Sequence, residues 1–152
     1  MKKILLALTL ALLSSCSILA KKNLFVHFPD GDNVDRVYVS GTLMKQAGGI
    51  SGVGKYSLAA KDAKGVEIYT IDNPNKNDLK TIKEELERIL QIYKAEEVVK
   101  QTSGKERNEI YILYESGSKK ETKPLGLLIV SMEGRNANFV FLETTDFSHL
   151  YL

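Results

Sequence analysis

The chain has very little cysteine: of its 152 residues, only Cys16 carries a thiol. A lone thiol has no partner within the chain, so the folded part can contain no intramolecular disulfide. Proteins exported into oxidising compartments commonly use such bridges. If this chain is exported, its folded body must be held together by its apolar core alone.

The start of the chain lacks an apolar run long enough to cross a membrane. Spanning the roughly 30 Å hydrocarbon core takes about 20 residues of helix, whereas the run from Ile4 to Leu13 is shorter and is broken by Thr9. A short apolar run between a basic start, Lys2-Lys3, and small residues is typical of an export signal. Residues 1–15 are therefore predicted to be a signal peptide.

The end of this signal resembles the bacterial lipobox, in the residues Leu13-Ser14-Ser15-Cys16. In that pattern a peptidase cuts just before the cysteine, and acyl chains such as palmitate are attached to the mature terminus. The resemblance implies cleavage between Ser15 and Cys16 and lipidation of Cys16. Each buried methylene contributes about 0.8 kcal/mol, so one chain binds marginally and two or three anchor durably. Residues 16–22 would be the lipidated cysteine and a short tether.

The residues after Cys16 bear on which membrane would hold the protein. Ser17 stands where an aspartate tends to retain enteric-type lipoproteins on the inner membrane, and residues 17–23 lack the acidic side chains of some surface-export signals. We therefore expect an outer-membrane lipoprotein on the periplasmic face, with the cell surface or the inner membrane as alternatives. The alternative to the anchor itself is an ordinary secretory signal that happens to contain a cysteine.

The predicted mature chain also lacks an excess of charge of one sign. The full sequence has 21 basic and 19 acidic side chains, and loss of Lys2 and Lys3 with the signal leaves 19 of each. A neutral surface gives no electrostatic reason to expect nucleic acid as a partner. The expected partners are the membrane, through the acyl chains, and an envelope protein or a small ligand.

Two helices are predicted. The longer begins at Asn77 or Asp78 and extends to Tyr93, with apolar side chains at helical spacing along one side. The shorter covers residues 42–46 and is capped by Ser40.

Alternating or continuous apolar patterns predict six strands, at residues 34–39, 66–71, 96–102, 109–115, 125–132 and 138–143. Short connections favour a sequential antiparallel meander, and parallel pairing of the first two strands around the short helix stays open. Together the elements predict one α+β domain at residues 23–152, a two-layer sandwich of a mostly antiparallel sheet and two helices. Several strands are apolar on both sides, and two helices cannot cover both faces. One face is therefore expected to carry an exposed apolar region.

Side chains suited to catalysis or metal binding are few. His27 and His149 are the only histidines, and both are expected to be partly buried at the domain margins. Asp30, Asp32 and Asp35 cluster, but a calcium-binding EF-hand loop needs a glycine at its sixth position and a glutamate at its twelfth, which this segment lacks. The cluster is expected to be a polar turn. No catalytic residue, metal site or cofactor is predicted, and no ligand-binding residue can be named.

Three other features have simple structural interpretations. The glycine-rich segment 48–54 follows a helix and lacks the ending of a phosphate-binding loop, so we expect a connection or a contact loop. Lys119, Lys120 and Lys123 at a hairpin tip favour solubility, with head-group contact as the alternative. The seven tyrosines are common in sheets, but they could also line a carbohydrate- or peptide-binding face.

The lipobox, the segment 37–44 and the apolar strands at 110–115, 127–130 and 139–142 together carry a resemblance. On these the mature chain resembles an uncharacterised domain-of-unknown-function family of small lipoproteins from Bacteroidetes-type envelopes. The likeness is one of layout: a strand, a serine-led helix, a long helix and a strand meander. The chain departs from it at Glu143-Thr144-Thr145-Asp146, where a glycine before a final aspartate-led segment is expected. The resemblance implies no functional residues.

Three classes of function remain. The first is a membrane-anchored envelope lipoprotein with a non-enzymatic binding or assembly role. The alternative is a carrier of a small apolar ligand, sheltered between sheet and helices. A hydrolase comes third, because it would need His27 or His149 beside an acid and a nucleophile in one cleft.

Overall fold

The computed structural model describes residues 23–43, 63–115, 123–145 and 147. The predicted signal peptide, Cys16 and the tether lie outside the described residues, as do His149, Lys119, Lys120 and the segment 48–54. Within the described part of the chain, no helix is long and apolar enough to cross a membrane.

All six predicted strands are confirmed. In chain order they are β1 Val34–Ser40, β2 Gly65–Asp72, β3 Glu96–Ser103, β4 Glu106–Tyr114, β5 Pro124–Glu133 and β6 Asn136–Glu143. The largest shift is at β4, which begins three residues earlier than expected. The β3–β4 and β5–β6 loops are short because Gly104 and Gly134 take left-handed φ angles of 60° and 58°, which tight hairpins favour.

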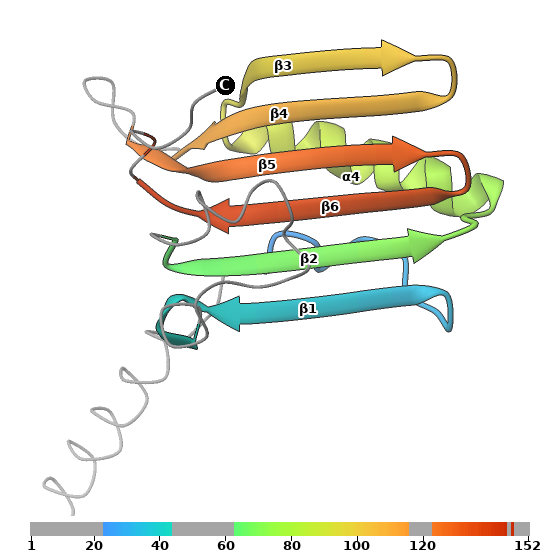
Figure 1. Cartoon of the computed structure of the whole chain (residues 1–152), viewed down its shortest axis with the longest axis horizontal. Coiled ribbons are helices and arrows are strands. Elements are labelled where there is room, and N and C mark those ends of the chain that lie inside the picture. The colour runs from blue at the N-terminus through green and yellow to red at the C-terminus, as the bar shows by residue number, and fades with distance from the viewer. Residues whose placement is uncertain (1–22, 44–62, 116–122, 146, 148–152) are drawn as a thin grey trace, which may run out of the picture.

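The strands form one antiparallel sheet in the order β1-β2-β6-β5-β4-β3. The meander from β3 to β6 is confirmed, and β6 then pairs with β2. Parallel pairing of the first two strands is wrong, because β1 and β2 are antiparallel along their whole length. β2 and β3 point the same way, and Figure 1 shows the helix between them behind the sheet. This is a right-handed crossover, the hand that such connections almost always take.

The predicted long helix is confirmed as α4, Lys76–Ile92. Its cap is Asn75, whose side chain accepts the N–H of Asn77 at 2.8 Å and of Asp78 at 3.0 Å. The carboxylate of Asp78 in turn accepts the N–H of Asn75, which completes a capping box. The helix therefore begins earlier than the predicted start at Asn77 or Asp78. The sequence did not single out the cap, because several neighbouring residues have side chains able to cap a helix.

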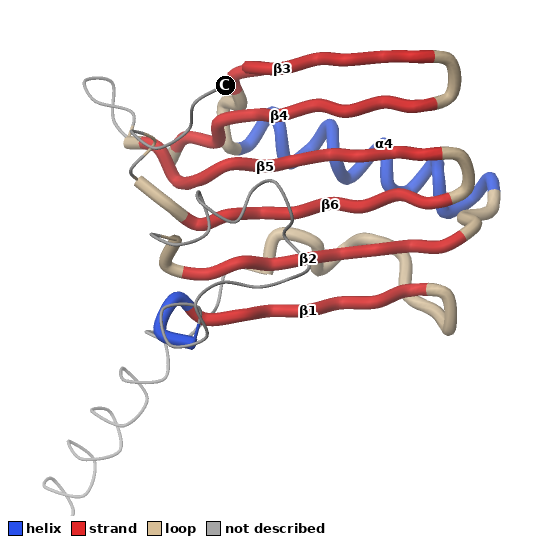
Figure 2. The backbone as a smooth tube through the Cα atoms, viewed as in Figure 1, coloured by secondary structure: helices blue, strands red, loops and turns tan. Residues whose placement is uncertain are grey.

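One face of the sheet is covered by α4 and by the chain that precedes β1 (Figures 1 and 2). Ile82, Leu86 and Ile89 of α4 are buried in the same core as Leu24 and Phe25. That core also contains Tyr69 and Phe139 from the sheet, and the rings of Phe25, Phe28, Tyr69 and Phe139 lie with their centroids 5.0–6.1 Å apart. Such tilted and edge-on pairs add to the stability that burial provides.

The predicted short helix is described only in its first turn. Gly41–Leu43 is helical, and the N–H of Leu43 donates to the hydroxyl oxygen of Ser40 at 3.4 Å. Ser40 therefore acts as the expected cap. The rest of this predicted helix lies outside the described residues.

Candidate functional site

The chain before β1 is fastened to the sheet by side chains of β1 and β2. We call residues 24–29 the strap. Glu67 of β2, although an ionisable residue, faces the core and is buried. Its carboxylate accepts the backbone N–H of Leu24 at 2.8 Å and of Phe25 at 3.3 Å. Buried N–H groups outside regular structure need such acceptors, so Glu67 allows an irregular segment to lie on the sheet.

Arg36 of β1 satisfies the carbonyl groups of the same strap. Its guanidinium donates to the carbonyl oxygen of Phe25 at 2.6 Å, of Phe28 at 2.9 Å and of Pro29 at 3.1 Å. The guanidinium also lies over the Tyr69 ring, 5.0 Å from its centroid, at cation–π distance. The hydroxyl of Tyr69 donates to the Pro29 carbonyl at 2.9 Å. The strap is thus bound through both its donors and its acceptors.

Burial changes the titration of two groups in this contact. It raises the pKa of Glu67, although the N–H groups of Leu24 and Phe25 and the charge of Arg36 act in the opposite direction. It also raises the pKa of Tyr69 to about 12. Tyr69 therefore stays a neutral hydrogen-bond donor at any physiological pH.

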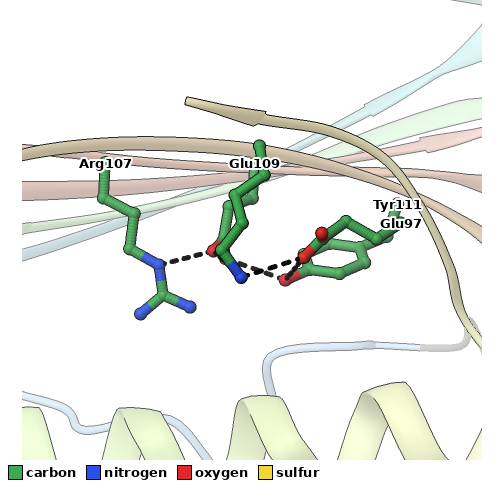
Figure 3. Close-up of polar contacts among 5 residues, drawn as sticks. Glu97, Arg107, Glu109 and Tyr111 are labelled. Carbon is green, nitrogen blue, oxygen red and sulfur yellow. Dashed lines mark hydrogen bonds and ion pairs between the residues drawn. The ribbon is translucent and has the colours of Figure 1, made fainter. Parts of the chain in front are cut away.

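A second buried carboxylate, Glu109 of β4, lies in a network that joins β4 to the edge strand β3 (Figure 3). Its side chain is completely buried. It accepts Nε–H of Arg107 at 2.7 Å and the hydroxyl of Tyr111 at 2.8 Å. From β3, Lys100 places its ammonium 3.7 Å from Glu109 and 3.3 Å from Glu97.

The network keeps Glu109 ionised. Burial opposes the charge, but the Arg107 and Tyr111 hydrogen bonds and the charges of Arg107 and Lys100 outweigh it and lower the pKa of Glu109. Burial raises the pKa of Tyr111, and so do its hydrogen bond to Glu109 and the charges of Glu109 and Glu97, although the charge of Arg107 acts in the opposite direction. Because the carboxylate is enclosed and its oxygens are occupied, the arrangement suits cross-linking of two strands better than proton transfer.

The face of the sheet opposite α4, which we call the second face, is organised in rows that run across all six strands. Opposed residues of neighbouring strands point to the same face, so the register defines each row. One row is apolar throughout: Val37, Ile68, Val140, Ile129, Ile110 and Val99. The next is apolar except at β3: Val39, Val66, Leu142, Leu127, Ile112 and Glu96.

A third row on the second face is polar throughout: Asp35, Thr70, Asn138, Ser131, Asn108 and Gln101. Two hydrogen bonds tie neighbours in this row. The Thr70 hydroxyl donates to the Asn138 side chain at 2.9 Å, and the Ser131 hydroxyl donates to that of Asn108 at 2.7 Å. The second face therefore has an apolar half and a polar half.

The apolar rows are not broadly exposed, which corrects the expectation from sequence. Val66, Leu127, Ile129 and Leu142 are buried, and the other apolar members of β2, β4 and β6 are half-buried. Ala63 and Phe147 pack against them, so the chain itself covers part of this face. Exposure is greatest at the β1 end, where Val37 is 47% exposed.

Three of the large exposed apolar side chains lie on or next to β1, with Val37 and Tyr38 on opposite faces of the sheet. Besides Val37, Tyr38 is 42% exposed and Leu43, just beyond the strand, is 55% exposed. The opposite edge strand, β3, carries none among the large exposed apolar residues of the described chain. The two edges of the sheet therefore differ in character.

The candidate residues noted in the sequence do not meet in one site. His27 is exposed, so its predicted partial burial is wrong; it lies on the outer side of the strap, whose neighbours Phe25 and Phe28 fill the core. Asp30 and Asp32 lie in a polar turn that leads into β1, as expected, and Asp35 lies in β1 itself. Over the described ranges, no group of three or more His, Cys, Asp or Glu side chains could hold a metal ion.

Glu67, Arg36 and Glu109 were not predicted from the sequence as site residues, although the sequence pattern around two of them indicates a buried charge. Glu67 alternates with Tyr69 and Ile71, and Glu109 alternates with Tyr111 and Leu113. A carboxylate on the apolar side of a strand is expected to have a partner. Arg36 left no such signal, because its acceptors are backbone carbonyls.

Comparison with known proteins places the chain in a family. Neither the search of curated proteins nor the search of solved structures finds a significant match. A family match does extend over residues 28–149, from the strap to beyond the last strand. The chain therefore belongs to the family described as a domain of unknown function, DUF4252.

Proposed function

We propose that the protein is a lipid-anchored envelope lipoprotein with a non-enzymatic binding or assembly role, held on the periplasmic face of the outer membrane. In this proposal residues 1–15 are removed and Cys16 is acylated. The body is a two-layer sandwich of sheet and helices that works next to the membrane.

The main support for the proposal from the structure is the attachment of the strap to the sheet. Leu24 and Phe25 are bound by Glu67, and the carbonyls that follow are bound by Arg36. The part of the chain that is bound to the sheet therefore begins at Leu24, two residues after the end of the predicted tether. Seven residues, 16–22, reach at most about 25 Å when extended. A body attached in this way would stay close to the membrane, with the β1–β2 side nearest the anchor.

A binding role is supported by the side chains at that same side of the sheet. Val37, Tyr38 and Leu43 expose apolar groups along the β1 edge, Val37 and Tyr38 on opposite faces of the sheet, and we take this exposed apolar edge as the candidate interaction site. The proposal therefore puts the partner contact beside the anchor rather than at the far edge.

The alternative, a carrier with a small apolar ligand between sheet and helix, has less support. The space between the strap and the sheet is occupied by the Phe25, Phe28, Tyr69 and Phe139 rings, with centroids 5.0–6.1 Å apart. A ligand there would have to displace side chains that already pack against one another.

Site-specific crosslinking in intact cells tests the binding role. A photo-crosslinking amino acid replaces Leu43, and the matched control carries it at Lys105, an exposed residue in the β3–β4 hairpin. We expect a defined adduct of reproducible mass from position 43 and none from position 105. An equal pattern from both positions, or no adduct above the unlipidated C16S form, would contradict the proposal.

A further inference from the structure

We propose that the helix layer, which consists of α4 and the strap, lies against the surface of an anionic phospholipid membrane, and that the second face points away from it. This orientation rests on the proposed anchor at Cys16, which brings the body to a membrane but does not determine which side of the body meets the lipid headgroups. Two sides are available, and the attachment of the strap and the charges on the two faces favour the helix layer.

The described chain begins on the helix side of the sheet (Figure 1). Glu67 of β2 holds the N–H groups of Leu24 and Phe25 there. The seven residues 16–22 reach at most about 25 Å. To turn the second face towards the membrane, they would have to pass about 10 Å sideways around β1 and about 10 Å across the two layers. A membrane against the helix layer requires no such detour.

The second face carries charge of one sign. Alternation along the strands places five carboxylates on it: Asp35, Asp72, Glu96, Glu106 and Glu133. The basic residues of the described strands, Arg36, Lys100 and Arg107, all lie on the helix side of the sheet. Charges interact with an anionic surface over about 8 Å at physiological ionic strength. Headgroups with negative charge would therefore repel the second face.

The charges of α4 are divided between its two halves. Residues 76–83 contain three lysines and one aspartate, whereas residues 84–92 contain three glutamates and one arginine. The helix dipole favours the reverse order, with acidic residues near the start. A lysine four residues before a glutamate, as in the pair Lys80–Glu84 at 3.8 Å, is also the weaker orientation. Helix stability therefore does not explain the basic first half of α4.

Contact with anionic headgroups does explain it. The side chains of Lys80 and Lys83 are 74% and 76% exposed, so both ammonium groups are accessible. Basic side chains close to a membrane are attracted to anionic lipids. Lys21 and Lys22 of the predicted tether add two more such charges next to the strap.

The strap contributes an exposed apolar turn to the same layer. The N–H of Phe28 donates to the carbonyl of Phe25 at 3.0 Å, which closes a turn with Val26 and His27 at its tip. Phe25 and Phe28 are buried, whereas Val26 is 54% exposed and His27 is exposed. Turns usually contain Gly, Pro, Asn, Asp or Ser, and residues 25–28 contain none of these. An apolar tip beside basic residues is suited to the headgroup region.

A single tryptophan in the full chain tests the orientation, because the chain has none of its own. V26W places it on the strap and V37W on the second face, and the two valines are similarly exposed, at 54% and 47%. The protein is held on vesicles of phosphatidylethanolamine and phosphatidylglycerol whose brominated acyl chains quench tryptophan. We expect at least about twofold more quenching of V26W than of V37W, since an interfacial side chain reaches the acyl boundary.

The contribution of charge is tested by adding K76Q/K80Q/K83Q to the V26W chain. Glutamine is about as good a helix former as lysine, so α4 should remain, and circular dichroism checks this. Quenching of V26W should fall in this variant. It should also fall when neutral phosphatidylcholine replaces phosphatidylglycerol. Quenching that neither change reduces would overturn the assignment of an anionic lipid surface.

Two results would overturn the orientation itself. The first is quenching of V37W that equals or exceeds that of V26W, in proteins whose circular dichroism and thermal unfolding match the wild type. The second is the absence of quenching from both positions while the protein floats with the vesicles in a density gradient, which would show that the body stands away from the lipid.

The way in which the protein is attached separates this inference from the proposed anchor. If Cys16 is acylated, the purified lipoprotein is reconstituted directly, and equal quenching of V26W and V37W would leave the anchor standing and show the orientation to be wrong. If Cys16 carries a free thiol, the anchor is wrong. That thiol, the only one in the chain, then couples the protein to a maleimide phospholipid, and stronger quenching of V26W would still support the helix layer as the lipid-facing side.

Discussion

The backbone N–H of Leu24 donates to Oε2 of Glu67 at 2.8 Å, across 43 positions of sequence. This bond and its neighbour at Phe25 connect the start of the folded chain to an interior strand. E67A would leave both buried N–H groups without an acceptor, and each such group costs about 1–3 kcal/mol. We expect a loss of about 2–4 kcal/mol in urea unfolding, with faster hydrogen exchange at Leu24 and Phe25. E133A, at the exposed end of β5, should change stability by less than about 0.5 kcal/mol.

The two buried carboxylates should give opposite dependences of stability on pH. Burial raises the pKa of Glu67 in the folded protein above its ordinary value of 4.5. The folded state therefore binds this proton more tightly than the unfolded chain does. The stabilisation is fully present below the unfolded pKa and is lost as pH rises through the folded pKa. The free energy of unfolding of wild type relative to E67Q should fall as pH rises above about 4.5.

Glu109 should behave in the opposite way, because the Arg107 and Tyr111 contacts lower its pKa against the effect of burial. Its stabilisation is present above the unfolded pKa and is lost as pH falls through the folded pKa. The advantage of wild type over E109Q should therefore disappear on acidification. Urea titrations of both variants between about pH 3 and 7 measure the two slopes. Slopes of the same sign would contradict the assigned environments.

The hydroxyl groups of Tyr111 and Tyr114 offer a matched comparison on one strand. Tyr111 donates to buried Glu109 at 2.8 Å, and Tyr114 donates to exposed Glu96 at 2.7 Å. Y111F removes a charge-assisted bond from an enclosed carboxylate and should cost about 1.5–3 kcal/mol. Y114F should cost less than about 0.5 kcal/mol, because water can replace the lost donor. Equal losses in thermal or urea unfolding would mean that the Glu109 network is open to solvent.

The start of α4 can be checked with two asparagines. Asn75 accepts two N–H groups of the first turn, so N75A should cost about 1 kcal/mol of stability. Asn77 lies inside the first turn, and N77A should change stability by no more than a few tenths of a kcal/mol. A larger loss for N77A than for N75A would move the helix start to the position predicted from sequence.

The hydrophobic pattern of the sequence predicts which segments form strands and helices, but it does not predict how these elements are arranged. Local periodicity was enough for all six strands and for α4, since each depends on neighbours along the chain. The insertion of β2 beside β6 was not predictable, because it depends on how the meander returns to a strand on the other side of α4. Glu67 and Glu109 are visible in sequence as charges on apolar sides of strands, but their partners are not.

The second face shows the same limit. The apolar character of both sides of β4 and β5 predicted a second apolar surface, and the surface is present. Its expected exposure was wrong, because Ala63 and Phe147 pack on the central rows. Their return to the sheet is set by the three-dimensional path of the chain. The exposed remainder at Val37 became recognisable only when β1 was found at an edge.

Mass spectrometry of the N-terminal peptide from protein purified out of native membranes is the sharpest test of the proposed lipid anchor. We expect a peptide that begins at Cys16 and carries the added mass of two or three acyl chains. A peptide that still begins at Met1, or a Cys16 terminus with a free thiol, would contradict the anchor and with it the placement of the protein beside a membrane.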